Sequence, residues 1–168
     1  LAALAQSLAQ SPGRLDILVN CHGTSRFVPA QDLHALDDEL VDRVLTTHLR
    51  GSFATARAFQ ALLDVSGQGL IVNISSIAPE LGVGSNIMYC AAKAGVNSLT
   101  RSLALALAPR VRVVALSPGL VETEAAKSFD AAFKADHVQR TPLRRLVTPV
   151  DIGRSVVALA THMKIGRA

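Results

Sequence analysis

The sequence predicts an α/β fold: a partial doubly wound (Rossmann-type) parallel sheet with helices on both faces. Three short, apolar, β-rich runs occur at residues 16–20, 70–74 and 111–116. Long stretches with helical periodicity separate them, at about residues 36–63 and 86–107. Short strands that alternate with long helices are typical of βαβ units, in which the strands run parallel and helices cover them. The near-continuous apolar character of the three runs agrees with strands buried on both faces.

The first half of the chain begins with a helix. Residues 1–10 are rich in Ala and Leu, which indicates an amphipathic helix, and Ser11-Pro12-Gly13 ends it. In residues 36–63 the apolar side chains recur close to every 3.6 residues, so we expect one long helix there. Gly67-Gln68-Gly69 breaks that pattern before the second strand.

The second half contains the other long helix and a less regular segment. Pro109 marks the end of helix 86–107, and Ser117-Pro118-Gly119 stops the third strand. The sequence is then polar and irregular to about residue 147. Thr148-Pro149-Val150-Asp151 opens the last helix, where proline suits the first turn.

Composition and charge indicate a single globular domain over residues 1–168, with 49% hydrophobic and 18% charged side chains. No apolar run approaches the ~20 residues that span a bilayer, so we expect no membrane association. The net charge is +4, but the arginines are scattered without aromatic neighbours, which argues against nucleic-acid binding. Cys21 and Cys90 have neither disulfide nor metal-ligand spacing and no signal peptide is recognised, so we expect a cytoplasmic protein without a metal site.

The only tyrosine of the sequence, Tyr89, stands four residues before Lys93. In a helix, residues with this spacing lie on one face. A nearby ammonium favours the phenolate, so the pair predicts a tyrosine with a lowered pKa that exchanges protons with an alcohol or carbonyl. Taken alone, the pair is equally compatible with chance on a solvated helix face.

Small or polar residues follow each strand, and this places further groups beside the pair. The strand ends are Asn20-Cys21-His22-Gly23, Ser75-Ser76 and Ser117-Pro118-Gly119. In open α/β sheets, sites form at the carboxyl ends of the strands. Because the helix with Tyr89 and Lys93 starts at the same edge, we expect Ser76, the pair and the Pro118-Gly119 turn to lie within reach of one another.

Five motifs in order carry a resemblance that covers almost the whole chain. They are Asn20-Cys21-His22-Gly23, Ile71-Val72-Asn73-Ile74-Ser75-Ser76, Tyr89-Cys90-Ala91-Ala92-Lys93, Pro118-Gly119-Leu120-Val121-Glu122-Thr123 and Pro149-Val150-Asp151-Ile152-Gly153. In these motifs the sequence resembles the short-chain dehydrogenase/reductase family, in particular 3-oxoacyl-carrier-protein reductases. The resemblance implies NAD or NADP as cofactor and a small-molecule alcohol or carbonyl as substrate.

The resemblance also implies a role for each residue. Tyr89 would be the general acid/base, Lys93 would lower its pKa and hold the nicotinamide ribose, and Ser76 would hydrogen-bond the substrate carbonyl. Residues 124–146 would form a substrate lid. The cofactor would lie along Tyr89, Lys93 and a further set: Asn20, Gly23, Pro118, Gly119, Val121 and Thr123. Taken singly, each residue also has a purely structural interpretation: Ser76 could be a turn residue at the end of a strand, and Thr123 could be a helix cap.

One departure from the family pattern is His48, in Thr47-His48-Leu49-Arg50-Gly51-Ser52-Phe53. The family usually has an asparagine there, which holds a water that links the lysine to solvent. A histidine also bonds water, but it titrates near pH ~6.5 and can carry a charge. We count His48 among the candidate catalytic residues, with a packed helix histidine as the alternative.

A second departure concerns the ends of the motif set. The glycine-rich cofactor loop that opens the family, Thr-Gly-x-x-x-Gly-x-Gly, does not occur in this sequence, nor does the family's final strand. We therefore expect a truncated domain, in which strand 16–20 is an apolar exposed edge and the chain self-associates or is poorly soluble.

Two functions follow. The first is an oxidoreductase that moves a hydride between NAD(P) and an alcohol or carbonyl. The alternative is an inactive remnant or fragment with only an assembly role. In both cases the helices 36–63 and 86–107, which pair subunits in the family, predict a homo-oligomer. The sequence decides neither the substrate nor the choice between NAD and NADP.

Overall fold

The computed structural model describes residues 1–124, 126 and 129–163, which fall into two compact units. The first is Leu1–Leu116, and the second begins at Ser117. Among the residues that the structure describes, no helix is long and apolar enough to cross a membrane.

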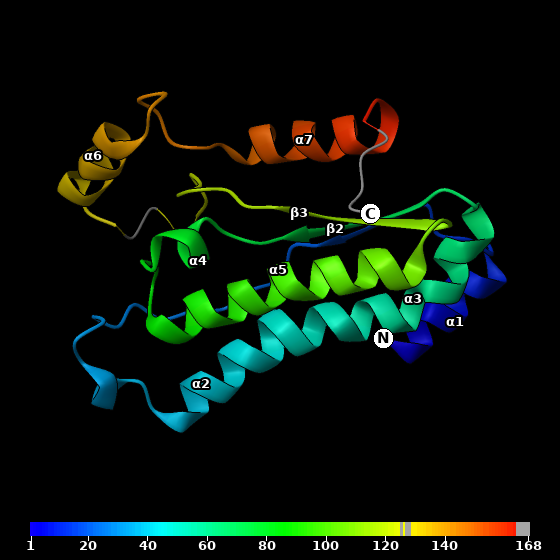
Figure 1. The fold of residues 1–168 in the computed structure, drawn as a ribbon, viewed down its shortest axis with the longest axis horizontal. Helices are drawn as coiled ribbons and strands as arrows, with labels where there is room; N and C mark the ends of the chain where they lie inside the picture. The colour runs from blue at the N-terminus through cyan, green and yellow to red at the C-terminus, as the bar shows by residue number, and fades with distance from the viewer. Residues whose placement is uncertain (125, 127–128, 164–168) are drawn as a thin grey trace. The chain divides into compact units, whose positions relative to one another are not determined.

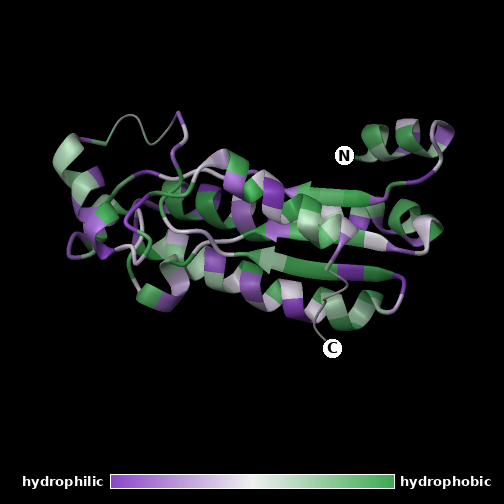
Figure 2. Ribbon diagram, turned by 90° about the horizontal axis from the view of Figure 1, so that it is seen from above, coloured by the Kyte–Doolittle hydropathy of each residue, from purple (hydrophilic) through white to green (hydrophobic). Residues whose placement is uncertain are grey.

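The first unit contains a parallel sheet in the order β1 (Ile17–Asn20), β2 (Gly69–Ile74) and β3 (Val111–Leu116), as Figure 1 shows. The three predicted strands and the α/β class are therefore confirmed. The strands are largely apolar along their length (Figure 2). Because all three run in the same direction, their carboxyl ends meet at one edge of the sheet.

β1 is the outer strand of this described sheet, since it pairs only with β2. The side chains of Ile17 and Val19 are 39% and 40% exposed, whereas Asn20 at the end of the strand is buried. The predicted apolar edge at residues 16–20 is thus present in the structure.

The helices of the first unit lie where the periodicity predicts them, with short additions. The long helix 86–107 is α5, and the helix of residues 1–10 is α1. Two short helical turns, Leu33–Ala35 and α4, are not indicated by the sequence pattern. The bounds are α1 Ala2–Gln10, η1 Leu33–Ala35, α2 Asp38–Leu45, η2 Thr46–Arg50, α3 Gly51–Ser66, α4 Ala78–Leu81 and α5 Ile87–Leu107.

The predicted single helix 36–63 differs from the structure in its bounds and in its middle. The helical segment begins at Asp38 and ends at Ser66, and the turn η2 between α2 and α3 is a π-helix rather than an α-helix. Such single π turns insert an extra residue into a helix and occur frequently at functional sites. The apolar periodicity does not reveal it, because Leu45, Leu49 and Phe53 still recur at helical spacing through the turn.

Side-chain and glycine caps fix the ends of these helices. Asp37 accepts a hydrogen bond from the Leu40 backbone N–H at 2.7 Å, and so begins α2. At the start of α5 the Asn86 side chain accepts from the Tyr89 N–H, also at 2.7 Å. α3 ends at Gly67, whose φ of 67° lies in the left-handed region that glycine tolerates best.

The core of the first unit lies between the sheet and two helices. α3 and α5 pack along the same face, where α5 contacts β3 and α3 contacts β1 and β2 (Figure 1). The buried side chains of this core are Ala56, Phe59, Leu62, Leu63, Ile71, Ala104, Val111 and Val113. With about 25 cal/mol gained per Å² of buried apolar surface, this apolar core holds both helices against the strands.

The second unit contains α6 (Ala131–Arg140) and α7 (Pro149–Thr161). The sequence predicts α7 but only an irregular segment where α6 forms. α6 begins at Asp130, whose carboxylate accepts from the Phe133 N–H at 2.7 Å. Three of its five apolar residues are alanines, which give only a weak helical pattern, so the cap was the main local signal.

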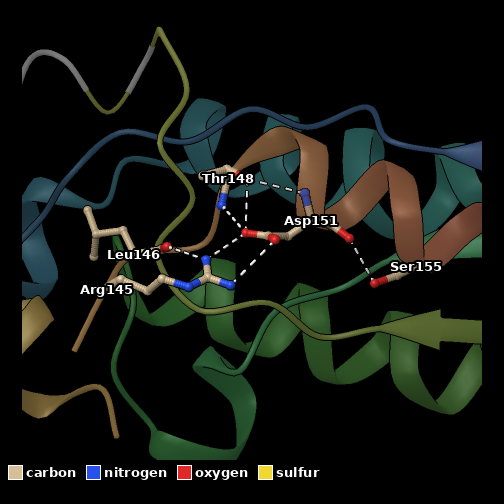
Figure 3. Close-up of polar contacts among 5 residues, drawn as sticks. All are labelled: Arg145, Leu146, Thr148, Asp151 and Ser155. Atoms are coloured by element: carbon tan, nitrogen blue, oxygen red, sulfur yellow. Dashed lines mark hydrogen bonds and ion pairs between the residues drawn. The ribbon is translucent and has the colours of Figure 1, made fainter. Parts of the chain in front are cut away.

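A polar cluster fixes the start of α7, as Figure 3 shows. Thr148 and Asp151 form a capping box, in which the threonine hydroxyl accepts from the Asp151 N–H at 3.2 Å. The Asp151 carboxylate accepts from the Thr148 N–H at 3.0 Å and from Arg145 Nη1 at 2.7 Å. The hydrogen bond from Arg145, with those from Thr148, holds the Asp151 pKa well below its usual range. An isolated parallel bridge pairs Val121 with Val147 just before this cluster.

Candidate active site

Tyr89 and Lys93 project from adjacent turns near the start of α5, as their spacing predicts. The Lys93 ammonium nitrogen lies 5.8 Å from the centroid of the Tyr89 ring. The Asn86 cap fixes the backbone at Tyr89, and α5 packs on β3, so both side chains are held on a rigid element. The structure therefore brings the pair together at the carboxyl edge of the sheet.

Lys93 is almost fully buried, with 5% of its surface exposed. Its ammonium donates a hydrogen bond to the Ile74 carbonyl at 2.7 Å, at the end of β2. Burial lowers the pKa of Lys93 to about 8, because the charged form loses its hydration. The amine is still mostly an ammonium at pH ~7, but it loses its proton at a lower pH than a solvated lysine does.

The structure corrects the predicted direction of the Tyr89 shift. Burial raises the pKa of Tyr89 above its ordinary value, and interaction with the Ser76 hydroxyl opposes this only in part. Lys93 does not overcome the loss of hydration, since its ammonium bonds the Ile74 carbonyl rather than the phenol. Tyr89 is thus a neutral phenol near neutral pH and a weaker acid than a solvated tyrosine.

Ser76 follows β2 and has two kinds of contact. Its hydroxyl accepts a hydrogen bond from the Ala78 N–H at 3.1 Å, which is the turn role that a strand-end serine often has. The same hydroxyl lowers the pKa of Tyr89 by hydrogen bonding. The structure therefore brings Ser76, Tyr89 and Lys93 together, from β2 and α5.

His48 lies in the π turn η2 and is 3% exposed. Its ring meets the Tyr89 ring edge to face, with centroids 5.3 Å apart and planes at 85°. Nε2 lies 2.8 Å from the Thr24 carbonyl oxygen, while Nδ1 is buried without a hydrogen-bond partner. Burial is the main cause that lowers the pKa of His48, and the charges of Lys93 and His22 add to it. His48 is accordingly neutral near pH ~7.

Asn20 and Gly23, the two cofactor candidates after β1, differ in their surroundings. The Asn20 side chain donates to Asn73 at 2.8 Å and accepts from the Thr55 hydroxyl at 2.7 Å, so it joins β1 to β2 and α3. Asn73 in turn donates to Thr100 on α5 at 2.9 Å. Gly23 is exposed and contacts the His48 ring.

The other four cofactor candidates, Pro118, Gly119, Val121 and Thr123, belong to the second unit. Within that unit Val121 is paired with Val147, and the Thr123 hydroxyl accepts from the Ala126 N–H at 3.4 Å. Thr123 therefore has the local capping contact that is common for threonine. Their part in a cofactor site stays a prediction.

The sequence did not predict three residues that hold the side chains at the carboxyl edge of the sheet. The Thr24 backbone holds His48, the Asn86 side chain caps α5 at Tyr89, and Asn73 links Asn20 to the helix behind it. Only Asn86 has a local signal, since an asparagine three residues before the tyrosine is a recognisable cap. The other two contacts depend on segments that are distant in sequence.

The parallel sheet with serine, tyrosine and lysine at its carboxyl edge defines a dehydrogenase/reductase-type α/β protein. A family model described as enoyl-(acyl carrier protein) reductase matches residues 1–165. The chain belongs to the short-chain dehydrogenase/reductase family.

Individual relatives of known sequence or structure support the same family assignment. A ketoacyl reductase assigned to the granaticin polyketide synthase of Streptomyces violaceoruber is 40% identical over 93% of this chain and 64% of the relative. The 7alpha-hydroxysteroid dehydrogenase of Clostridium sardiniense is 33% identical over 95% of this chain and 62% of the enzyme. Among solved structures, ElxO with NADP bound is 25% identical, with a TM-score of 0.86, over 97% of this chain and 66% of that chain. The chain thus spans 62% and 64% of the length of these two curated relatives.

Proposed function

We propose that this chain carries the acid/base half of an NAD(H)- or NADP(H)-dependent oxidoreductase that interconverts an alcohol and a carbonyl. The observation that carries the proposal is the buried Lys93 beside Tyr89 and Ser76 at the carboxyl edge of the sheet. Perturbed titratable groups gathered at such an edge are typical of catalytic sites.

The residues at this edge fit a nicotinamide cofactor chemically. Lys93 has three N–H donors, of which Ile74 accepts one, so others are free to hold the hydroxyls of a ribose. Gly23 is exposed, although the His48 ring occupies the side on which a Cβ would lie. No glycine-rich phosphate loop occurs in this sequence, so the proposal concerns the nicotinamide end of the cofactor. A bound nicotinamide would supply or accept the hydride.

The residues of the chain supply the proton. In reduction, the Tyr89 hydroxyl donates a proton to the substrate oxygen, and in oxidation the phenolate takes it back. The Ser76 hydroxyl hydrogen-bonds the same oxygen and stabilises the charge that develops there. In the free site Tyr89 is a neutral phenol, which is the form that donates the proton in carbonyl reduction. Lys93, whose pKa burial lowers to about 8, is suited to return the proton to the phenolate.

His48 has a proposed place in the same proton transfer. Its neutral, buried ring contacts Tyr89, and Nδ1 has a free position for a hydrogen bond. We expect His48→Asn to shift the pH–rate profile, because an amide cannot titrate. An unchanged profile would assign His48 to packing alone.

The test of the proposed function has two stages. Quenching of NADH or NADPH fluorescence measures binding, and loss of nicotinamide absorbance with a panel of 3-oxoacyl thioesters, ketosteroids and simple ketones measures turnover. We expect Tyr89→Phe to bind cofactor but to lose about 10²–10⁴ in rate, since it removes only the proton donor. A Tyr89→Phe variant as active as the parent would refute the role of the tyrosine.

A second proposal, an assembly role through a homo-oligomer, has one supporting observation. Helices α2, α3 and α5 and the π turn border an apolar groove lined by Leu45, Thr46, Leu49, Arg50, Phe53 and Leu99. Phe53 is 44% exposed there. Such an apolar surface is typical of an interface. These residues lie in the two long helical segments, 36–63 and 86–107, that we propose pair the subunits.

Light scattering after size exclusion tests this surface. We expect Phe53→Lys to lower the oligomeric state, because a charge in an apolar interface stays unpaired. Leu33→Lys, at a 63% exposed residue outside both helices, is the matched control. A folded chain that assembles but binds neither cofactor would favour the assembly role over the enzyme.

A further inference from the structure

The loop of residues 82–86, between α4 and α5, lies directly against Tyr89. A Cβ added at Gly84 would lie 3.1 Å from Tyr89 Cδ1. The same Cβ would lie 2.9 Å from Cys90 Sγ and 3.2 Å from Ala78 Cβ. Contacts of 3.0–3.4 Å are already tighter than nine in ten real Cβ contacts, and real Cβ atoms essentially never come under 3.0 Å. Glycine is therefore the residue that fits this position without displacing a neighbour.

Hydrogen bonds hold the 82–86 loop in place at its end nearest α5. The Ser85 carbonyl accepts from the Val28 N–H at 2.8 Å, and the Ser85 hydroxyl contacts the hydroxyl of Ser25. The Asn86 side chain, which is 3% exposed, donates to the Arg26 carbonyl at 2.9 Å and to the Ser25 hydroxyl at 3.1 Å. The chain is thus fixed immediately after the glycine, so the loop cannot easily move aside to admit a side chain.

The other neighbour of the glycine, Ala78 on α4, is held as well. Ala78 is 4% exposed, and α4 packs against α5. A hydrogen bond of 3.2 Å from the Asn97 amide on α5 to the Glu80 carboxylate on α4 joins the same two helices. α4 therefore keeps its position relative to the helix that carries Tyr89, and a methyl group added to the loop has little room on this side.

Tyr89 itself is held at its backbone and at its ring. The Asn86 side chain accepts from the Tyr89 N–H at 2.7 Å, so the residue that anchors the loop also fixes the backbone of the tyrosine. The His48 ring meets the phenol ring edge to face, with centroids 5.3 Å apart, and the loop reaches the Cδ1 edge. Only rotation about the side-chain torsions could move the hydroxyl, and these neighbours restrict that rotation.

We propose that Gly84 is a positioning residue, which allows the 82–86 loop to pack on the Tyr89 ring and so places the tyrosine hydroxyl for proton transfer. This inference rests on the proposed oxidoreductase function. Gly84 supplies no group to the reaction and acts through the ring alone. Proton transfer needs the hydroxyl within about 2.6–3.2 Å of the substrate oxygen, so even a small displacement of the ring lowers the rate.

Near-ultraviolet circular dichroism tests the contact without substrate or cofactor. Tyr89 is the only tyrosine and the chain has no tryptophan, so the tyrosine band reports this one ring. The band depends on fixed packing around the ring. We expect Gly84→Ala to lose most of the band while the far-ultraviolet spectrum is retained. Gly153→Ala, whose added Cβ meets no atom within 4 Å, is the matched control and should keep both. An unchanged band in Gly84→Ala overturns the inference.

A second substitution tests whether overpacking is the cause. Cys90→Ala removes the sulfur that lies closest to the added methyl group, so the methyl group can move away from the ring. We expect Cys90→Ala alone to keep the tyrosine band, and Gly84→Ala in that background to recover most of it. Equal losses from Gly84→Ala in both backgrounds overturn the inference.

Asn86→Asp tests the anchoring of the loop without any added bulk. The carboxylate still accepts from the Tyr89 N–H, but it cannot donate to the Arg26 carbonyl or to the Ser25 hydroxyl. We expect the tyrosine band to weaken while the helix content is kept. This variant decides the question even where Gly84→Ala does not fold, since a parent-like band in Asn86→Asp shows that the anchored loop does not hold the ring.

Turnover and cofactor titration then separate positioning from binding. We expect Gly84→Ala to lower kcat about tenfold or more, with the Kd of NADH and NADPH within about twofold of the parent, because the change acts on the proton donor. Gly153→Ala should leave both values unchanged. A parent-like kcat, or a loss confined to cofactor affinity, overturns the positioning role. If the parent chain turns over no substrate, the proposed function itself fails, while the tyrosine band still reports on the packing of the loop.

Discussion

The depressed pKa of Lys93 predicts that its charge destabilises the folded chain. The folded pKa is about 8, against 10.5 for the solvated amine. At 1.36 kcal/mol per unit, the folded state loses about 3 kcal/mol at about pH 7 relative to a lysine with unchanged hydration. Between the two pKa values the unfolded chain binds more protons, so stability rises with pH there.

Lys93→Met removes this titration while keeping an unbranched side chain of similar length. The substitution also loses the hydrogen bond to the Ile74 carbonyl, which contributes about 1–3 kcal/mol. The free energy lost with this hydrogen bond changes little with pH. The pH dependence of the stability difference between parent and variant therefore reports the ionisation of the amine alone. We expect the stability of Lys93→Met relative to the parent to fall by about 2 kcal/mol between about pH 7 and about pH 9.5.

Urea unfolding followed by circular dichroism at several pH values measures this difference, since ΔG is linear in denaturant. Gly153→Ala, which removes no ionisable group, is the control and should run parallel to the parent at every pH. The reasoning fails if parent and Lys93→Met have parallel pH profiles. A slope of opposite sign would mean that the folded state favours the ammonium.

Three further predictions concern stability and association. Thr148→Ala should lower the free energy of unfolding by about 1 kcal/mol in denaturant melts, because it removes half of the capping box; an unchanged midpoint contradicts this. Thr100→Val should lose about 1–3 kcal/mol, since the buried Asn73 amide loses its acceptor, and a neutral effect would mean that another acceptor replaces it. Val19→Lys should reduce self-association in light scattering, because charge on the exposed edge strand opposes strand pairing. Unchanged association would place the contact elsewhere.

The fold was largely predictable because its signals are local. The three strands and the helix that carries Tyr89 follow from apolar runs and from the periodicity of a few neighbouring residues. The sequence pattern did not predict α6, because most of its apolar residues are alanines that give a weak pattern. It did not predict the π turn either, because that turn adds only a single residue to the helix.

The sequence predicted which residues make up the candidate site, but not the pKa shifts of those residues. Spacing and strand ends placed Ser76, Tyr89 and Lys93 together, and the structure agrees. The direction of the Tyr89 shift was wrong, because the sequence shows a charge four residues away but not the loss of hydration.

By itself, then, the sequence determined the family, the strands of the sheet and the pair of acid/base candidates, since all of these depend on residue types at short, fixed spacings. Only the tertiary structure decided that Lys93 is buried against the Ile74 carbonyl, that burial raises the pKa of Tyr89, and that His48 fits against Gly23. The physical reason is that burial and hydration depend on every segment that surrounds a group, and those segments come from distant parts of the chain.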